Sequence, residues 1–140
     1  MAFTDKTRVN EFAQKKSICV MACHIDESSA DEFATAGNFV IANLPPEAVI
    51  LDAYVHTIAA SNAGAITLGT TEGGTEILSA GDSATPGKSG TFTGQSVTGT
   101  GVPVYMSTAA NVTPANIGDF VVVIDYLEYE KNTGEYTRFL

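Results

Sequence analysis

The sequence predicts an all-β protein: a single-domain antiparallel β-sandwich or jelly roll that follows an N-terminal extended arm or short helix. Apolar and polar side chains alternate with period two along several segments, which is typical of strands with one buried face. Turn-forming residues separate these segments, and no helical pattern lies between them, as a parallel α/β fold would require. The 140 residues fit one domain. We expect residues 1–16 to form the arm and residues 17–140 the sandwich.

Seven to nine short strands are expected, bounded by glycine, proline, asparagine and serine. The candidate strands, in chain order, are Ser17–Ile25, Asn38–Asn43, Ala48–Ala59, Ala65–Thr70, Thr75–Ser79, Thr91–Val97, Val102–Ser107, Asp119–Glu130 and Glu135–Phe139. Turns are expected at Ser61–Gly64 and Glu72–Gly74, and a hairpin turn at Asn132–Gly134.

Four of these segments carry more detailed expectations. The apolar run Ser17–Ile25 suits a strand buried on both faces, although the residues alone also permit a helix. Pro103 predicts an edge position or a bulge for its strand, because proline cannot donate to a ladder. In Ala48–Ala59 and Asp119–Glu130 strict alternation assigns each side chain to a face. It places Val49, Leu51, Ala53 and Val55 on one face and Asp52, Tyr54 and His56 on the other; it likewise separates Phe120, Val122, Ile124 and Tyr126 from Val121, Val123, Asp125 and Leu127.

Composition and charge restrict the partners. Only 16% of the residues are charged, which suits a surface that neighbouring proteins cover. The net charge is -9, made up of +2 in residues 1–16 and -11 in the remainder. An acidic body repels phosphate, so no nucleic acid is expected as a partner. No apolar run is long enough for a membrane span, and we expect no secretion signal because the first residues lack an apolar core.

Cys19 and Cys23 lie four residues apart. On a strand that spacing separates them by roughly 13 Å, about twice what a disulfide allows. We therefore expect two free thiols that act as small apolar residues, and synthesis in a reducing compartment.

One segment suggests a nucleotide site. Asp82–Ser89 resembles a phosphate-binding loop, but it lacks the first glycine and a helix after Lys88. A glycine-rich β-loop is the better interpretation.

The sequence also gives little support for a metal site or for acid–base catalysis. His24, close to Asp26 and Glu27, and His56 lack a third metal ligand at a recognisable spacing. Paired carboxylates such as Glu128 and Glu130 fit a solvated strand face better than a glycosidase pair. We expect no catalytic, cofactor-binding or metal-binding residues and no cofactor, and predict that the chain is not an enzyme.

A family resemblance follows from three segments. Phe39–Ile58, with its Leu-Pro-Pro break, Ala65–Thr70 and Gly118–Tyr126 resemble the small structural proteins of tailed bacteriophages, over roughly residues 38–127. The resemblance implies a compact, often trimeric β-sandwich or jelly roll that serves as a capsid decoration (cement) protein or a related head or tail component. It carries no catalytic residues.

From this resemblance we expect a virion protein that is made in the host cytoplasm and stabilises the head through protein–protein contacts. Its partners would be further copies of itself, as a homotrimer, and the major capsid protein or other virion proteins. A carbohydrate- or receptor-binding sandwich of a fibre or tail, or another neck or tail component, is the alternative. The candidate interface residues are Phe3, Lys6, Arg8, Phe12, Tyr126, Tyr129 and Tyr136.

Overall fold

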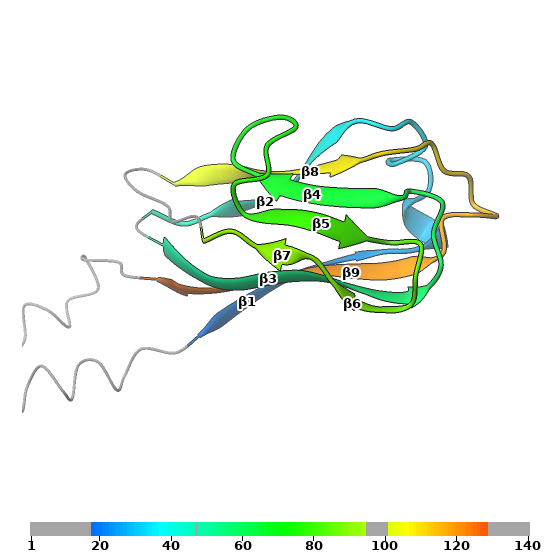
Figure 1. Ribbon diagram of the computed structural model, residues 1–140. Coiled ribbons are helices and arrows are strands. Elements are labelled where there is room, and N and C mark those ends of the chain that lie inside the picture. The colour runs from blue at the N-terminus through cyan, green and yellow to red at the C-terminus, as the bar shows by residue number, and fades with distance from the viewer. Residues whose placement is uncertain (1–17, 47, 95–100, 129–140) are drawn as a thin grey trace, which may run out of the picture.

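Two antiparallel sheets pack face to face in the computed structural model, which describes residues 18–46, 48–94 and 101–128 (Figure 1). The expected β-sandwich is confirmed, and no α-helix occurs in these ranges. The elements are β1 (Cys19–Ile25), the 3-10 helix η1 (Glu27–Ser29), β2 (Asn38–Leu44), β3 (Ala48–Ala59), β4 (Ala65–Gly69), β5 (Leu78–Asp82), β6 (Gly87–Ser89), β7 (Thr91–Phe92), β8 (Val102–Thr108) and β9 (Asp119–Glu128).

The chain passes repeatedly between the two layers. Sheet A has the strand order β1-β9-β3-β6, and sheet B has the order β2-β8-β4-β5-β7. Every pairing between neighbouring strands is antiparallel. Antiparallel sheets can bury one face and leave the other accessible, and each of these two sheets has an inward and an outward row of side chains.

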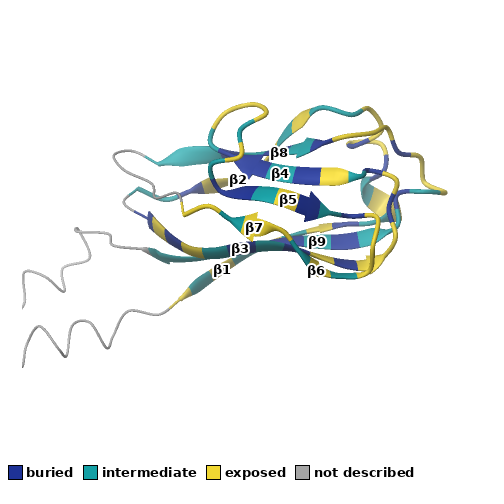
Figure 2. Ribbon diagram, viewed as in Figure 1, coloured by how far each residue is buried: buried dark blue, intermediate teal, exposed yellow. Residues whose placement is uncertain are grey.

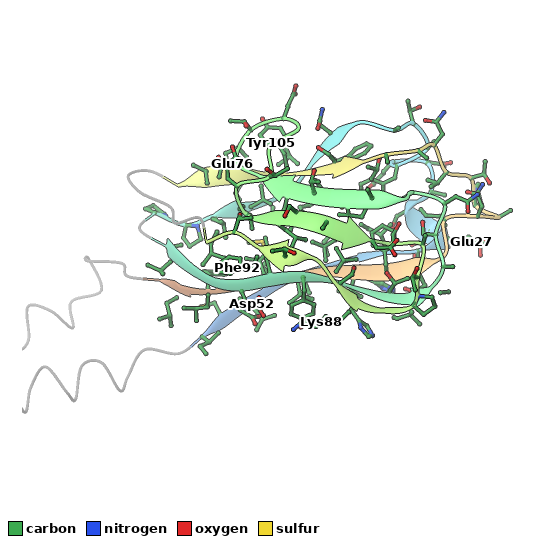
Figure 3. All side chains as sticks on the ribbon, viewed as in Figure 1. Glu27, Asp52, Glu76, Lys88, Phe92 and Tyr105 are labelled. Carbon is green, nitrogen blue, oxygen red and sulfur yellow. The ribbon has the colours of Figure 1, made fainter. Side chains whose placement is uncertain are left out.

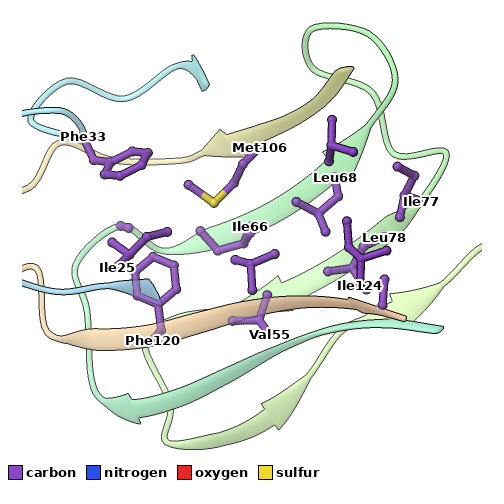
Figure 4. Close-up of a cluster of buried hydrophobic side chains, with 14 of the residues drawn as sticks. Ile25, Phe33, Val55, Ile66, Leu68, Ile77, Leu78, Met106, Phe120 and Ile124 are labelled. Carbon is purple, nitrogen blue, oxygen red and sulfur yellow. The ribbon is translucent and has the colours of Figure 1, made fainter. Parts of the chain in front are cut away.

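The core lies between the sheets and is built from the inward rows of both (Figure 4). Phe120 of β9 and Val55 of β3 face Ile66 and Met106 of sheet B, and all four are at most 1% exposed. Each such side chain contributes roughly 1.5–3 kcal/mol through removal from water. At one end, the rings of Phe33 and Phe39 meet edge to face with centroids 4.7 Å apart.

β1 differs from its expectation. It is a strand, so the helical alternative is wrong, but it is not buried on both faces. Within the described ranges it pairs only with β9 and forms one edge of sheet A. Ile18, just before it, and Val20 are 61% and 65% exposed, whereas Ile25 is buried. β1 is apolar in both rows because its outward row, on the outer face of sheet A, is apolar as well as its inward row.

β3 matches its predicted bounds, but the assigned faces are partly wrong. Ala53 and Val55 are buried as a pair, yet Val49 and Leu51 point outward and are 37% and 39% exposed. The register with β9 shifts between Ile50 and Asp52. The extra residue of a β-bulge inverts the alternation on one side of it, so a strict period of two fails there.

The glycine-rich region also departs from prediction. The strand expected at Thr75–Ser79 begins later, as β5, and the segment expected at Thr91–Val97 is described only as the two-residue β7. The short strand β6 was not predicted. β8 is an interior strand between β2 and β4, but Pro103 lies beyond its pairing with β4, which ends at Tyr105. Its missing N–H therefore breaks no pairing with β4.

The remaining sequence expectations divide into two groups. Cys19 and Cys23 are free thiols, as predicted, and both are half-buried in the inward row of β1. The pKa of the Cys23 thiol is raised by burial, and further by Glu32. The N-terminal arm and the hairpin at Asn132–Gly134 lie outside the described residues.

Candidate docking surface

The outer face of sheet A carries most of the exposed apolar surface. Among the described residues, six large apolar side chains are exposed, and the strand registers place five of them on this face or at its margin: Ile18, Val20, Val49, Leu51 and Ile58. Figure 2 shows exposed segments on β1 and β3. The sixth, Val40, is alone on the other sheet. The largest contiguous apolar patch on a protein surface is often functional. We call these five residues, with the outward Ala22, Tyr54, Val121, Val123 and Leu127, the apolar face.

Strand register makes the apolar face continuous across three strands. Val123 of β9 lies opposite Ala22 of β1 on one side and opposite Tyr54 of β3 on the other. Val49 lies opposite Leu127 in the same way. Directly opposed side chains sit about 4.5–5.5 Å apart and pack against each other. Val123 is consequently 8% exposed although it points away from the core.

Charged groups interrupt the apolar face at one place. Asp52 of β3 and Asp125 of β9 are directly opposed, a pairing of like charges that is unfavourable. Lys88 of β6 offsets it: its Nζ lies 3.9 Å from Asp52 Oδ2 and 4.5 Å from the centre of the Tyr54 ring. Figure 3 shows Asp52 and Lys88 on this outer side of sheet A. Because both are well exposed, this ion pair contributes about 0–1 kcal/mol.

Sheet B presents a more polar exterior. Asn38 of β2 accepts hydrogen bonds through Oδ1 from the backbone N–H of Gly73, at 2.8 Å, and from the Ser107 hydroxyl. The outward partner of Val40 is Tyr105, labelled in Figure 3. The two exteriors therefore differ in chemistry, and most of the exposed apolar side chains of the described residues lie on sheet A.

A small polar cluster lies where β1 ends and β9 begins. His24 Nε2 is 2.5 Å from Asp119 Oδ1, and His24 Nδ1 is 3.9 Å from Asp26 Oδ2. The hydrogen bond with Asp119 raises the pKa of His24, and the negative charges of Asp119 and Asp26 add to it. Hydrogen bonds from the hydroxyl and backbone N–H of Ser28, at 2.6 and 2.9 Å, lower the pKa of Asp26.

This cluster borders an open hollow lined by Asp26, Glu27, Ser28, Gly118 and Asp119. Within the described parts of the chain, no three histidine, cysteine or carboxylate side chains are placed to hold a metal ion. The Ser28 hydroxyl donates to Asp26 and not to the imidazole, so the cluster does not activate a serine nucleophile. What the geometry shows is a hydrogen-bonded link between two strand ends.

The segment that resembles a phosphate-binding loop is a loop between the strands β5 and β6, in agreement with the predicted β-loop. Asp82 ends β5, and its Oδ1 accepts a hydrogen bond from the backbone N–H of Ala84 at 2.7 Å, which lowers the pKa of this carboxyl. β6 follows at Gly87–Ser89, where a nucleotide site would need a helix. Lys88 points to the apolar face instead.

The candidate interface residues from the sequence can be followed only at Tyr126. It lies in the inward row of β9, opposite Cys19 and Ile50, and packs against the core. The other candidates, Phe3, Lys6, Arg8, Phe12, Tyr129 and Tyr136, lie outside the described residues.

The apolar face itself was not predicted. A signal for it was present in β9, where Val121, Val123 and Leu127 alternate with a second apolar row. An antiparallel strand that is apolar in both rows, in a two-layer sandwich, must present one row to the exterior.

The chain was compared with protein families, curated proteins and solved structures. No protein-family model and no curated protein matches the chain. It is similar to a chain in the solved structure of the cyanophage Pam1 capsid asymmetric unit, with 18% sequence identity and a TM-score of 0.48, over 81% of this chain and 84% of that one. No helix in the described ranges is long and apolar enough to cross a membrane.

Proposed function

We propose that this chain is a non-enzymatic structural protein of a tailed-phage virion, and specifically a capsid decoration protein that stabilises the head by protein–protein contacts. The observation that carries the proposal is the apolar face of sheet A, which offers a surface for docking. The sequence resemblance over residues 38–127 supplies the class of assembly. Decoration requires burial of surface across joints between shell subunits and no reacting groups.

The apolar face has a suitable size for such a contact. Three neighbouring strands about ten residues long cover about 34 Å by 14 Å, so the footprint is roughly 500 Å². A standard interface buries about 800 Å² per partner. The face would thus supply the apolar centre of an interface, and its polar surroundings, including Asp52, Asp125 and Lys88, would supply the rim.

The proposed partners are the major capsid protein, or another virion protein, and further copies of this chain in a homotrimer. Closed cyclic assemblies bury the same surfaces in every copy, which suits a chain with few charged residues. The free cysteines agree with synthesis in the reducing cytoplasm of a host cell.

The test is the position of the chain on the virion whose genome encodes it, found by image reconstruction of particles with and without the gene. We expect extra density on the outer surface of the head that disappears when the gene is deleted. Density confined to the neck or tail would leave a virion protein but refute decoration. Absence of the chain from purified particles would refute the virion role itself.

A matched pair of substitutions tests the apolar face. Val20 and Val40 both lie on seven-residue edge strands, with exposures of 65% and 54%, but on opposite sheets. Val20→Glu buries a charge in the proposed interface, so binding of the purified protein to decoration-free shells should weaken at least tenfold. Val40→Glu should bind like the wild type. Equal binding by the two variants would show that sheet A does not face the shell.

A further inference from the structure

We infer that the free edge of β1 pairs, as an antiparallel strand, with β1 of a second copy of this chain. Among the described strands, β1 is the outermost of sheet A and has β9 as its one neighbour (Figure 1). Within the described ranges, no backbone group of Cys19–Ile25 hydrogen-bonds to any other segment. A row of unpaired N–H and C=O groups is a template for another strand. The inference does not rest on the virion role.

The strands at the other three sheet edges are protected in recognisable ways, and the part of β3 that β6 leaves uncovered has a register bulge between Ile50 and Asp52. β6 has three residues and carries Lys88, and β7 has two residues. β2 has seven residues, but its register with β8 breaks between Val40 and Ala42. Short length, an edge lysine and a bulge each discourage strand addition. β1 has seven residues in unbroken register with β9, no proline, and no charged residue apart from the imidazole of His24.

The sequence of β1 is complementary to itself about Ala22. In an antiparallel pair centred there, Ala22 of one copy faces Ala22 of the other, and Val20 faces His24. In the inward row, Met21 faces Cys23 and Ile25 faces Cys19, so every large side chain meets a small one. A shift by two residues would instead oppose Met21 to Met21. Self-complementarity of this kind is what a two-fold contact requires, and it favours a second copy over an unrelated strand.

Charge also favours this edge. The chain carries a net charge of -9, so most of its surfaces repel their own copies. β1 contains no carboxylate, and the first one after it, Asp26, would lie opposite Ile18 of the second copy. No like charges meet across the proposed pair. Since the two acidic bodies still repel at longer range, pairing should strengthen as salt is added.

The pairing would join two apolar faces. Directly opposed residues in an antiparallel pair point to the same side of the sheet, so the outward rows of both copies face one direction. The four strands of sheet A in each copy would form one continuous sheet. This two-fold contact is isologous and therefore distinct from a three-fold contact, which joins unlike surfaces.

Cross-linking at the proposed axis tests the inference with the full-length chain. Ala22→Cys places two thiols opposite each other, and mild oxidation should give covalent dimers on a non-reducing gel. The wild type, whose cysteines belong to the inward row, and Val40→Cys, on the other exposed long edge, are the controls. Dimer formation by Ala22→Cys no faster than by Val40→Cys would overturn the inference.

Native mass spectrometry tests the same inference independently, because it measures how many copies each species contains. At micromolar concentration the wild type should contain species with an even number of copies, and Ala22→Lys should weaken their formation at least tenfold. Ala22 is exposed, so the lysine should not disturb folding, and circular dichroism checks this point. An unchanged distribution of masses in folded Ala22→Lys would overturn the inference, whatever the location of the chain in a particle.

Discussion

His24 Nε2 lies 2.5 Å from Asp119 Oδ1, although the two residues are 95 positions apart in the sequence. The contact joins the next-to-last residue of β1 to the first residue of β9, next to the backbone pair of Ile25 and Phe120. It therefore fastens the edge strand of sheet A at the end opposite to Cys19. Because the imidazole is protonated in the stronger form of this contact, its contribution depends on pH.

The sign of the pH dependence follows from the raised pKa of His24. The unfolded state has the ordinary value of 6.5, and the folded state has a higher one. The stabilisation is therefore fully present below pH 6.5 and is lost as the pH rises through the folded value. The urea midpoint of the wild type should exceed that of His24→Gln more at pH 6 than at pH 9.

Two variants make this test specific. Asp119→Asn removes the main cause of the raised pKa, so it should lose the same pH-dependent part. His56→Gln changes the other histidine, which lies opposite Val121 on the outer face, and should follow the wild type at both pH values. A wild-type advantage over His24→Gln that is equal at pH 6 and pH 9 would contradict the assignment.

Gly81 of β5 lies so close to neighbouring atoms that the site has no room for a side chain. A Cβ built there lies 2.6 Å from the carbonyl oxygen of Ile66 and 3.1 Å from Val55 Cγ2, in the middle of the core. Gly81→Ala should lower the free energy of unfolding by about 1–3 kcal/mol, the usual range for overpacking.

Gly37 is the matched control, since an added Cβ meets no atom within 4 Å. Gly37→Ala should be neutral or stabilise the protein by about 0.4–1 kcal/mol, because alanine lowers the conformational entropy of the unfolded chain. Denaturant unfolding of both variants makes the comparison, and equal effects would show that β5 packs less closely on β4 and β3.

Ala80 occupies a backbone conformation that suits glycine. Its φ is 56°, and it is the one non-glycine residue with positive φ among those described. It lies where the register of β4 and β5 shifts, so two residues of β5 oppose one of β4. The left-handed conformation costs an L-residue about 1–2 kcal/mol, whereas glycine loses about 0.5–1 kcal/mol through its freer unfolded chain.

Ala80→Gly should therefore stabilise the protein by roughly 0.5–1 kcal/mol. Ala65→Gly, at another exposed alanine near the same bulge, has no strain to relieve and should destabilise by about 0.5–1 kcal/mol. The two effects have opposite signs in one thermal unfolding experiment. Destabilisation by both would mean that Ala80 is not strained.

The sequence predicts the sandwich because its strongest patterns lie in strands with regular alternation. β9 keeps its period of two from Phe120 to Tyr126, and β4 buries Ile66 and Leu68 as expected. In β3 the same reasoning fails at Leu51, where a bulge adds one residue. A bulge is fixed by pairing with another strand, and no local pattern in β3 reports it.

The candidate docking surface depends even more on topology. Val20 and Ile25 belong to the same apolar run, but one is exposed and the other buried. Which row faces water depends on which strand is the neighbour and on whether the strand is an edge. Both follow from pairings between residues about a hundred positions apart, such as Ala22 with Val123. The resemblance to phage structural proteins names no interface, so it could not supply this surface either.

The two sheets are also linked by polar groups near one margin. Thr57 of β3 is 1% exposed, and its hydroxyl donates to the backbone carbonyl of Asp82, in β5, at 3.0 Å. Ser89 of β6 donates to the same carbonyl at 3.1 Å and accepts from the Asp82 N–H at 2.9 Å. One peptide of sheet B is thus held by two hydroxyls from sheet A.

Because the two hydroxyls share one acceptor, their removal should not be additive. Thr57→Val leaves the Asp82 carbonyl bonded to Ser89 and should cost about 1 kcal/mol, the net value of one hydrogen bond. Ser89→Ala should cost somewhat more, since it also frees an N–H. The double variant leaves the carbonyl without either hydroxyl and should lose about 0.5–2 kcal/mol beyond the sum of the single effects. Denaturant unfolding of the wild type and the three variants completes this double-mutant cycle. Strictly additive losses in the free energy of unfolding would show that water hydrogen-bonds to the Asp82 carbonyl in place of the two hydroxyls.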